Sequence, residues 1–196
     1  VCRSTDLPVS VDTSKAIVAE AALAAGAQIV NDVTGLEHDP QMLEVVLRHE
    51  AAVCVMHMQG TPQTMQDDPS YQDVVQEVLQ YLRDRRDELL AAGIVQERIC
   101  LDPGIGFGKT YQHNLTLIRQ CDRFHQLDCP VLVGHSRKGF LAKVIGDVDA
   151  DRMAATVGVA LSLARLGVQI LRVHDVQPVR HALLSFEATG GLDERV

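Results

Sequence analysis

The sequence repeats one pattern six times: a short apolar run, rich in β-branched residues, ends abruptly in polar or glycine residues, and a helix-like segment follows. Continuous apolar runs, in place of a strict alternation of apolar and polar residues, are typical of strands covered on both faces, as in parallel sheets. With their polar ends, the six runs are Pro8–Ser14, Ala27–Gly35, Ala51–Met58, Arg98–Gly104, Pro130–Lys138 and Val168–Val176.

The segments between the runs have helical periodicity. The clearest, Asp73–Ala92, carries valines and leucines at three- and four-residue spacing and stops before a glycine. Lys15–Ala25 opens after an Asp-Thr-Ser triplet that suits a helix N-cap, and it also ends at a glycine. Further helices are expected at Pro40–Glu50, His113–Phe124, Asp151–Leu166 and Pro178–Thr189.

Strand and helix alternate in this way in α/β folds with a parallel sheet. All six runs end in polar residues, which favours a (β/α)8 TIM barrel, because an open doubly wound sheet places its ligand at one switch point. Six units in 196 residues amount to about 33 residues each, so eight would need about 260, near the ~250 typical of the barrel. We therefore expect one domain, residues 1–196, that contains strands 3–8 of a TIM barrel and lacks its first two βα units.

The charge of the chain limits its partners. Lys and Arg total 18 against 26 Asp and Glu, and the net charge of −8 disfavours binding to nucleic acid and to anionic membranes. No apolar run approaches the ~20 residues of a membrane helix, and the first residues lack a signal-peptide pattern. The five cysteines form no CxxC pair, so a reduced, cytoplasmic setting fits best.

Acidic, amide and basic side chains fall at the predicted strand ends. Each has an ordinary explanation when taken alone: a helix N-cap, a turn, a solvated basic turn or a His174–Asp175 hydrogen bond. Closing a barrel would bring them to one rim, where carboxylates and an amide suit a heterocycle with several N–H donors and basic groups suit an anionic leaving group. We therefore expect an uncharged heterocycle that carries a phosphate ester. The set is Asp12, Asn31, Asp102, Lys138, Arg172 and His174.

Two other features carry less information. The segment LDPGIGFGKT (residues 101–110) misses both common phosphate motifs: a Walker A loop needs glycine where Pro103 stands, and the dinucleotide fingerprint needs GxGxxG where this chain has GxGxG. We interpret its glycines as backbone that approaches a ligand closely. His57 lies among methionines without the spacing of a zinc site, which is more typical of a satisfied core or rim residue than of a ligand.

Six motifs, in order along the chain, resemble those of the dihydropteroate synthase family of pterin-binding enzymes. They are SVDTSK (10–15), NDVTG (31–35), VMHMQGTPQTMQ (55–66), LDPGIGFGK (101–109), GHSRKGF (134–140) and RVHDV (172–176). The resemblance implies a transferase of folate biosynthesis that condenses 6-hydroxymethyl-7,8-dihydropterin diphosphate with 4-aminobenzoate to give 7,8-dihydropteroate and diphosphate. It also implies a homodimer and Mg2+ as cofactor.

The resemblance further implies roles for individual residues. The pterin ring's amino and ring N–H groups would be bound by Asp12, Asn31 and Asp102, with Met56 packed on the ring. The aminobenzoate pocket would be lined by Phe107 and Ser136, with Lys138 contacting both this pocket and the pterin carbonyl. The diphosphate would be held by Arg172 and His174, and the catalytic candidates are Lys138, Arg172 and His174.

The chain departs from the family at its N-terminus. Family members carry a first strand whose asparagine helps to bind Mg2+ and a second strand with a Thr-Arg pair that meets the diphosphate, and neither motif is present here. We therefore expect no metal ligand in this chain and negligible turnover from these 196 residues alone. Two alternatives stay open: a methyltetrahydrofolate-dependent methyltransferase, which shares the barrel, and a non-catalytic pterin-binding remnant.

Overall fold

The computed structural model of this chain describes residues 1–193 and has an α/β fold built on parallel strands. Each strand lies inside one of the six predicted apolar runs, and β1, β2 and β4 include the polar residues at which these runs end. The strands are β1 (Ser10–Asp12), β2 (Ile29–Asp32), β3 (Ala52–Met56), β4 (Ile99–Asp102), β5 (Leu132–Val133) and β6 (Ile170–Leu171).

The strands are neighbours in the order in which they occur along the chain. β1 to β4 form one parallel sheet, and β5 and β6 form a parallel pair. A bridge between Leu101 and Val131 joins β4 to β5, and the Leu101 N–H donates to the Pro130 carbonyl at 2.9 Å. The described strands thus form one row in chain order, whereas an open doubly wound sheet reverses its strand order at a switch point.

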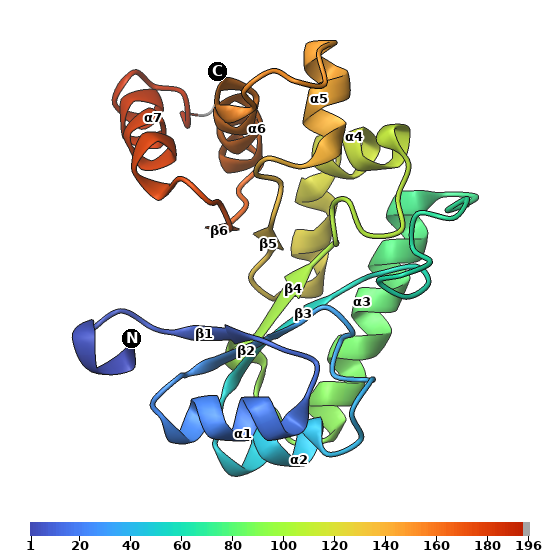
Figure 1. The fold of residues 1–196 in the computed structure, drawn as a ribbon, viewed down its shortest axis with the longest axis vertical. Coiled ribbons are helices and arrows are strands. Elements are labelled where there is room, and N and C mark those ends of the chain that lie inside the picture. Colours follow the sequence, from blue (N-terminus) through green and yellow to red (C-terminus); the bar gives the residue numbers. More distant parts are fainter. Residues whose placement is uncertain (194–196) are drawn as a thin grey trace.

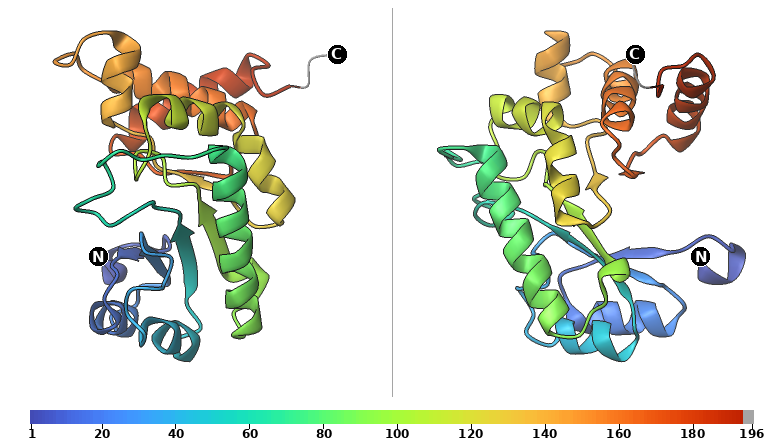
Figure 2. Two further views of the ribbon diagram at one scale, coloured as in Figure 1. Left: turned by 90° about the vertical axis from the view of Figure 1, so that its right-hand side faces the viewer. Right: turned by 180° about the vertical axis from the view of Figure 1, so that it is seen from behind.

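Helices cover the outside of this row, in an arc from α1 to α7 (Figures 1 and 2). Within residues 1–193 no helix is both long and apolar enough to cross a membrane. The helices are α1 (Ala16–Ala24), α2 (Met42–Arg48), α3 (Val74–Ala91), α4 (Tyr111–Arg119), α5 (Gly139–Ile145), α6 (Met153–Arg165) and α7 (Val176–Ala188), with 3-10 turns η1 (Cys2–Ser4), η2 (Gln96–Arg98) and η3 (Cys121–Leu127).

The two faces of the strand row have different surroundings, as the two-residue period of a strand requires. Val30, Val55 and Leu101 are fully buried and belong to the hydrophobic core, together with helical residues such as Leu82 and Phe124. The intervening residues face the other way and line a cavity of about 560 Å3, among them Asn31, Cys54, Cys100 and Leu132. The strand row therefore has a helix-covered outer face and an inner face that borders a cavity.

Three local expectations were wrong or incomplete. The residue that caps α1 is Lys15, without a side-chain bond, so Asp12 and its neighbours are not the cap; the first helical N–H, of Ala16, donates to Asp39 of a distant loop at 2.8 Å. α4 begins two residues earlier than expected because Thr110 forms a capping box with His113. The short helix α5, which directly follows Lys138, was not predicted.

Candidate active site

The polar residues identified in the sequence lie at the carboxyl ends of the strands, as expected. Asp12, Met56 and Asp102 are the last residues of β1, β3 and β4, and Asn31 precedes the last residue of β2. Arg172 directly follows β6, and Lys138 is the N-cap of α5 after β5. Because the strands are parallel, these ends meet at one edge of the row.

Arg172 connects three of these strand ends. Its Nη1 donates to Asn31 Oδ1 at 2.9 Å, a contact between residues 141 positions apart, and its Nη2 lies 3.5 Å from Asp102 Oδ2. The Nδ2 of Asn31 is buried and has no acceptor among the described residues, although buried amide groups are nearly always hydrogen-bonded. The site therefore holds a buried donor for which a ligand oxygen or ring nitrogen is a suitable partner.

Asp102 is the buried acid of the site, with 1% of its surface exposed. Burial raises the pKa of its carboxyl group, while the Arg172 guanidinium, the Gly104 N–H (2.8 Å from Oδ1) and the nearby lysines act in the opposite direction. A ligand that donates N–H hydrogen bonds stabilises such a buried carboxylate, because these bonds replace the hydrogen bonds to water that burial has removed.

Lys138 also acts on the charge of Asp102 and is half-buried. Its Nζ donates to the Ile105 carbonyl and lies 4.5 Å from the centre of the Phe107 ring. Burial lowers the pKa of Lys138 to about 8, with Asp102 raising it and Arg172 lowering it. Burial therefore shifts the pKa of this group toward the pH range in which enzymes work.

Ser136 and His174 form a pair between the ends of β5 and β6. The Ser136 Oγ lies 3.0 Å from His174 Nδ1 and accepts from the His174 N–H at 3.3 Å. Asp175 forms an ion pair with Arg137 at 2.6 Å, so the alternative of a His174–Asp175 bond is wrong. The exposed His174 is thus held by a buried hydroxyl group.

The predicted residues converge, but they do not line a single cavity. Asp12, Asn31 and Arg172 border the inner cavity of about 560 Å3. Phe107 and Lys138 border a second cavity of about 390 Å3 with Tyr111 and Phe140. Asp102 lies between the two sets, since both Arg172 and Lys138 act on its charge. The site therefore has two subsites that share one buried carboxylate.

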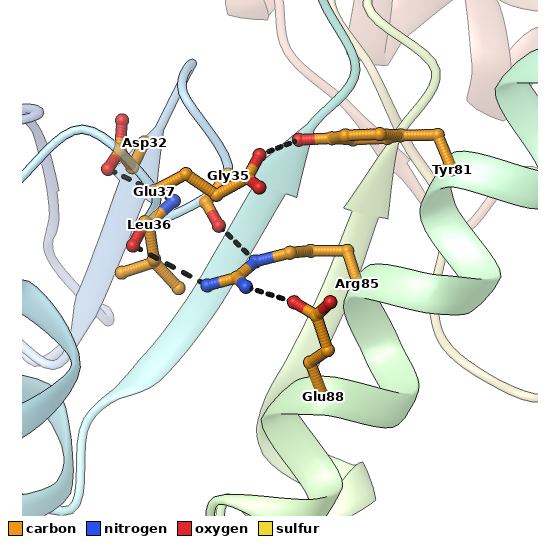
Figure 3. Close-up of polar contacts among 7 residues, drawn as sticks. All are labelled: Asp32, Gly35, Leu36, Glu37, Tyr81, Arg85 and Glu88. Carbon is orange, nitrogen blue, oxygen red and sulfur yellow. Dashed lines mark hydrogen bonds and ion pairs between the residues drawn. The ribbon is translucent and has the colours of Figure 1, made fainter.

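The loop after β2 is held in place by α3, as Figure 3 shows. Asp32 accepts from the Leu36 N–H at 3.2 Å, and Arg85 of α3 donates to the carbonyl oxygens of Gly35 (2.5 Å) and Leu36 (3.4 Å). Leu36 has a φ of 66°, in the left-handed region that non-glycine residues seldom occupy. These contacts fix the backbone that directly follows Asn31.

Sequence reasoning missed two residues that shape the site, Arg85 and Lys109. In the sequence, Arg85 looks like an ordinary solvated charge on a helix. The carbonyl groups to which it donates are about 50 residues away along the chain. Lys109 is 3% exposed and forms hydrogen bonds with His57 and Phe107, which belong to two different loops. The available signal for Lys109 was a lone lysine in a glycine-rich segment directly after a strand end.

Known proteins resemble this chain along most of its length. Residues 1–174 match the model of the pterin-binding enzyme family. The chain is 44% identical to a dihydropteroate synthase of Neisseria meningitidis serogroup C over 188 residues, which is 94% of this chain and 66% of that protein. It is 40% identical to the Escherichia coli K12 dihydropteroate synthase, of which it covers 67%. The chain thus spans about two thirds of the length of these relatives.

Solved structures agree with this result. A Yersinia pestis dihydropteroate synthase with a sulfonamide drug superimposes with a TM-score of 0.92 at 37% identity, over 97% of this chain and 69% of that one. A Thermus thermophilus dihydropteroate synthase in complex with 6HMPPP gives a TM-score of 0.88 at 46% identity, over 95% and 74%. The same enzyme has also been solved with 4-aminobenzoate, at 45% identity.

Proposed function

We propose, from the premise that this chain belongs to the pterin-binding enzyme family, that it is part of a dihydropteroate synthase. The reaction is the condensation of 6-hydroxymethyl-7,8-dihydropterin diphosphate with 4-aminobenzoate, which gives 7,8-dihydropteroate and diphosphate. The relatives that this chain matches in sequence carry that name, and Thermus thermophilus relatives have been solved with 6HMPPP and with 4-aminobenzoate.

One observation carries the proposal: the basic side chain that directly follows β6 meets the amide of β2 and the buried carboxylate of β4. The Arg172 contacts to Asn31 and Asp102 bring a cation against groups that suit the N–H edge of a heterocycle. A ligand that joins a pterin ring to a diphosphate has the matching distribution of donors and negative charge.

The proposed division of the site follows its two subsites. Asn31 and Asp102, with Asp12, bind the pterin N–H groups, and Met56, which is 1% exposed, packs against the ring. The aminobenzoate lies in the second cavity, beside Phe107 and Lys138. Ser136 does not border this cavity, and its role there stays a prediction from the family resemblance. Arg172 and His174 hold the diphosphate.

The chemistry then needs no protein nucleophile. The bond between the pterin methylene carbon and the diphosphate oxygen breaks, and the electron pair leaves with the diphosphate. The amino nitrogen of 4-aminobenzoate forms the new bond to that carbon and loses a proton. Cationic groups beside the departing oxygen lower the barrier by stabilising the negative charge that develops there, and fixed pockets align the two reactants.

The finer description of the fold belongs to the same proposal. A row of parallel strands in chain order, with helices outside and a cavity inside, is the arrangement of a barrel wall. We infer that the chain supplies six βα units, strands 3–8, of a TIM barrel. A homodimeric assembly and a cytoplasmic location stay predictions from the family resemblance.

Among residues 1–193 no group of three His, Cys, Asp or Glu side chains could hold a metal ion. Mg2+ stays a prediction from the family resemblance, and no step of the proposed chemistry is assigned to it.

The decisive experiment is a binding measurement. Calorimetric titration should show that the chain binds 6-hydroxymethyl-7,8-dihydropterin diphosphate in preference to methyltetrahydrofolate. Asp102→Asn and Arg172→Met should weaken this binding, whereas Arg83→Met, on the outer helix α3, should not. Preferential binding of methyltetrahydrofolate, or equal binding by all variants, would contradict the proposal. Product formation should be assayed for the chain and for the protein encoded by the whole reading frame that contains it, with negligible turnover expected from the chain alone.

A further inference from the structure

Lys109 is buried to a degree that is unusual for lysine, a residue that is seldom fully buried unless it is paired. Its Nζ lies 2.9 Å from His57 Nδ1, 3.3 Å from the His57 carbonyl oxygen and 2.9 Å from the Phe107 carbonyl oxygen. An ammonium group has three protons and no acceptor, so these three partners use its complete hydrogen-bonding capacity.

The three partners come from two loops. His57 opens the loop after β3, and Phe107 lies in the loop after β4, so Lys109 joins the two. The same loops touch through backbone: a Cβ on Gly104 would overlap the His57 carbonyl, and one on Gly108 would lie 2.5 Å from the Gln59 carbonyl oxygen. Both glycines also have positive φ angles.

Two further bonds connect these loops at their surface. Gln66 Nε2 donates to the Gly106 carbonyl at 2.9 Å, and the Tyr71 hydroxyl donates to the Gly108 carbonyl at 2.7 Å. Gln66 is exposed and Tyr71 is half-buried, so Lys109 forms the one fully buried connection among these three side chains. Bonds in a site removed from water are stronger and costlier to lose than surface bonds.

The joined loop carries the wall of the second cavity. Phe107 lies under the Nζ of Lys138 at 4.5 Å, and Lys138 also donates to the Ile105 carbonyl of the same loop. Tyr111 and Phe140 complete this part of the wall. A displacement of the loop therefore moves Phe107 and Lys138 together.

The charges of the pair are consistent with this arrangement. Burial, with a smaller effect of Lys109, lowers the pKa of His57 to about 3, so the ring is neutral, and its Nδ1 accepts from Lys109 in the tautomer that carries its proton on Nε2. Burial lowers the pKa of Lys109 to about 7, with Asp102 raising it and Lys138 lowering it. The three acceptors around Nζ favour the ammonium form.

We propose that Lys109, with His57 as its partner, is a positioning residue that sets the shape of the 4-aminobenzoate subsite by fixing the loop after β4. The identity of that substrate rests on the proposed function, whereas the pairing of the two side chains does not.

The kinetic test uses the protein encoded by the whole reading frame. Lys109→Met should raise the KM for 4-aminobenzoate about tenfold or more, since small misplacements of binding groups cost large factors. The KM for the pterin diphosphate should change by less than about twofold. Lys109→Arg, which keeps the charge, should recover part of the loss. Lys15→Met, at an exposed lysine, is the matched control. Equal increases of both KM values would overturn the proposal, because they indicate general loss of structure.

The partner residue gives a second, independent pair of variants. His57→Asn places an amide oxygen near the position of Nδ1 and should retain a low KM for 4-aminobenzoate. His57→Leu removes the acceptor and should raise this KM as Lys109→Met does. If the two His57 variants have the same KM, the side-chain bond has no positioning role.

A spectroscopic measurement separates this inference from the proposed function. In nitrogen NMR spectra of the chain, His57 should show an unprotonated Nδ1 and a protonated Nε2 at neutral pH, and the Nδ1 signal should shift in Lys109→Met. A His57 ring that titrates near its ordinary pKa of ~6.5 overturns the pairing. If the wild-type protein forms no dihydropteroate, the proposed function fails, and the pairing is then judged from these spectra alone.

Discussion

Replacement of Arg85 by methionine tests how the loop after β2 is held. Arg85 is 11% exposed, and its guanidinium donates to the carbonyl oxygens of Gly35 at 2.5 Å and Leu36 at 3.4 Å (Figure 3). Both of these residues are buried, so water cannot take over the bonds when the guanidinium is removed. Methionine keeps most of the aliphatic packing and removes only the donors and the charge.

The magnitude follows from the individual contacts. A hydrogen bond from a charged donor contributes about 1.5–3 kcal/mol, and a buried acceptor left without a partner costs a similar amount. The Leu36 contact is at the limit of hydrogen-bond length, and the Glu88 partner is 64% exposed, so each of these adds roughly 0.5 kcal/mol or less. We expect Arg85→Met to lower the free energy of unfolding by about 2–3 kcal/mol, or the melting temperature by roughly 5–10 °C.

Urea denaturation of the chain, followed by circular dichroism, measures this change. The midpoint should fall without a change in slope, because the loop is reorganised and the core is not. Arg83→Met is the matched control on the same helix: Arg83 donates to the exposed Gln80, and its loss should cost less than about 0.5 kcal/mol. If Arg85→Met is no more destabilising than Arg83→Met, the loop is not held by this arginine.

Three further outcomes are expected. Binding of 4-aminobenzoate, measured by calorimetry, should weaken as the pH rises through about 8, because Lys138 loses its proton there and no longer attracts the carboxylate. Lys138→Arg should abolish this pH dependence. If the pH dependence persists in that variant, another group is responsible for it. Gly104→Ala should destabilise the chain by at least about 2 kcal/mol in urea denaturation, since it combines a φ of 70° with overlap on a carbonyl group; an unchanged midpoint would contradict the close loop contact. Thr110→Ala should cost about 1 kcal/mol through loss of the α4 cap, and Thr110→Ser should cost less; equal effects would exclude a capping role.

The positions of the strands and most helices could be predicted from the sequence because their signals are local. The apolar runs that stop at Asp12 and Asp102 each predict a strand from adjacent residues alone, because a continuous apolar run and a polar end are both local features of the sequence. The same reasoning placed the polar residues at one edge, because parallel strands end on the same side. The family motifs then supplied roles for nine residues, seven of them polar, with the apolar Met56 and Phe107 added.

The partners of these residues could not be predicted in the same way. The bond between Arg172 and Asn31 joins positions 141 residues apart, and the acceptor for the first N–H of α1 is Asp39, from a loop 23 residues away. Such contacts depend on how the elements pack, which no local pattern records. α5 was missed for a related reason: seven residues that begin with Gly139 carry too little periodicity to distinguish a helix from a loop.

Gly104 and Gly108 each pack against the backbone of the loop after β3, and this close packing limits how the site can evolve. A side chain at either glycine would overlap the neighbouring loop. Single substitutions at these two positions are therefore disfavoured, and the backbone path of the loop is constrained. Altered substrate acceptance, whether by natural variation or in an engineered library, has to arise from side chains that project into the neighbouring cavity, such as Tyr111 and Phe140.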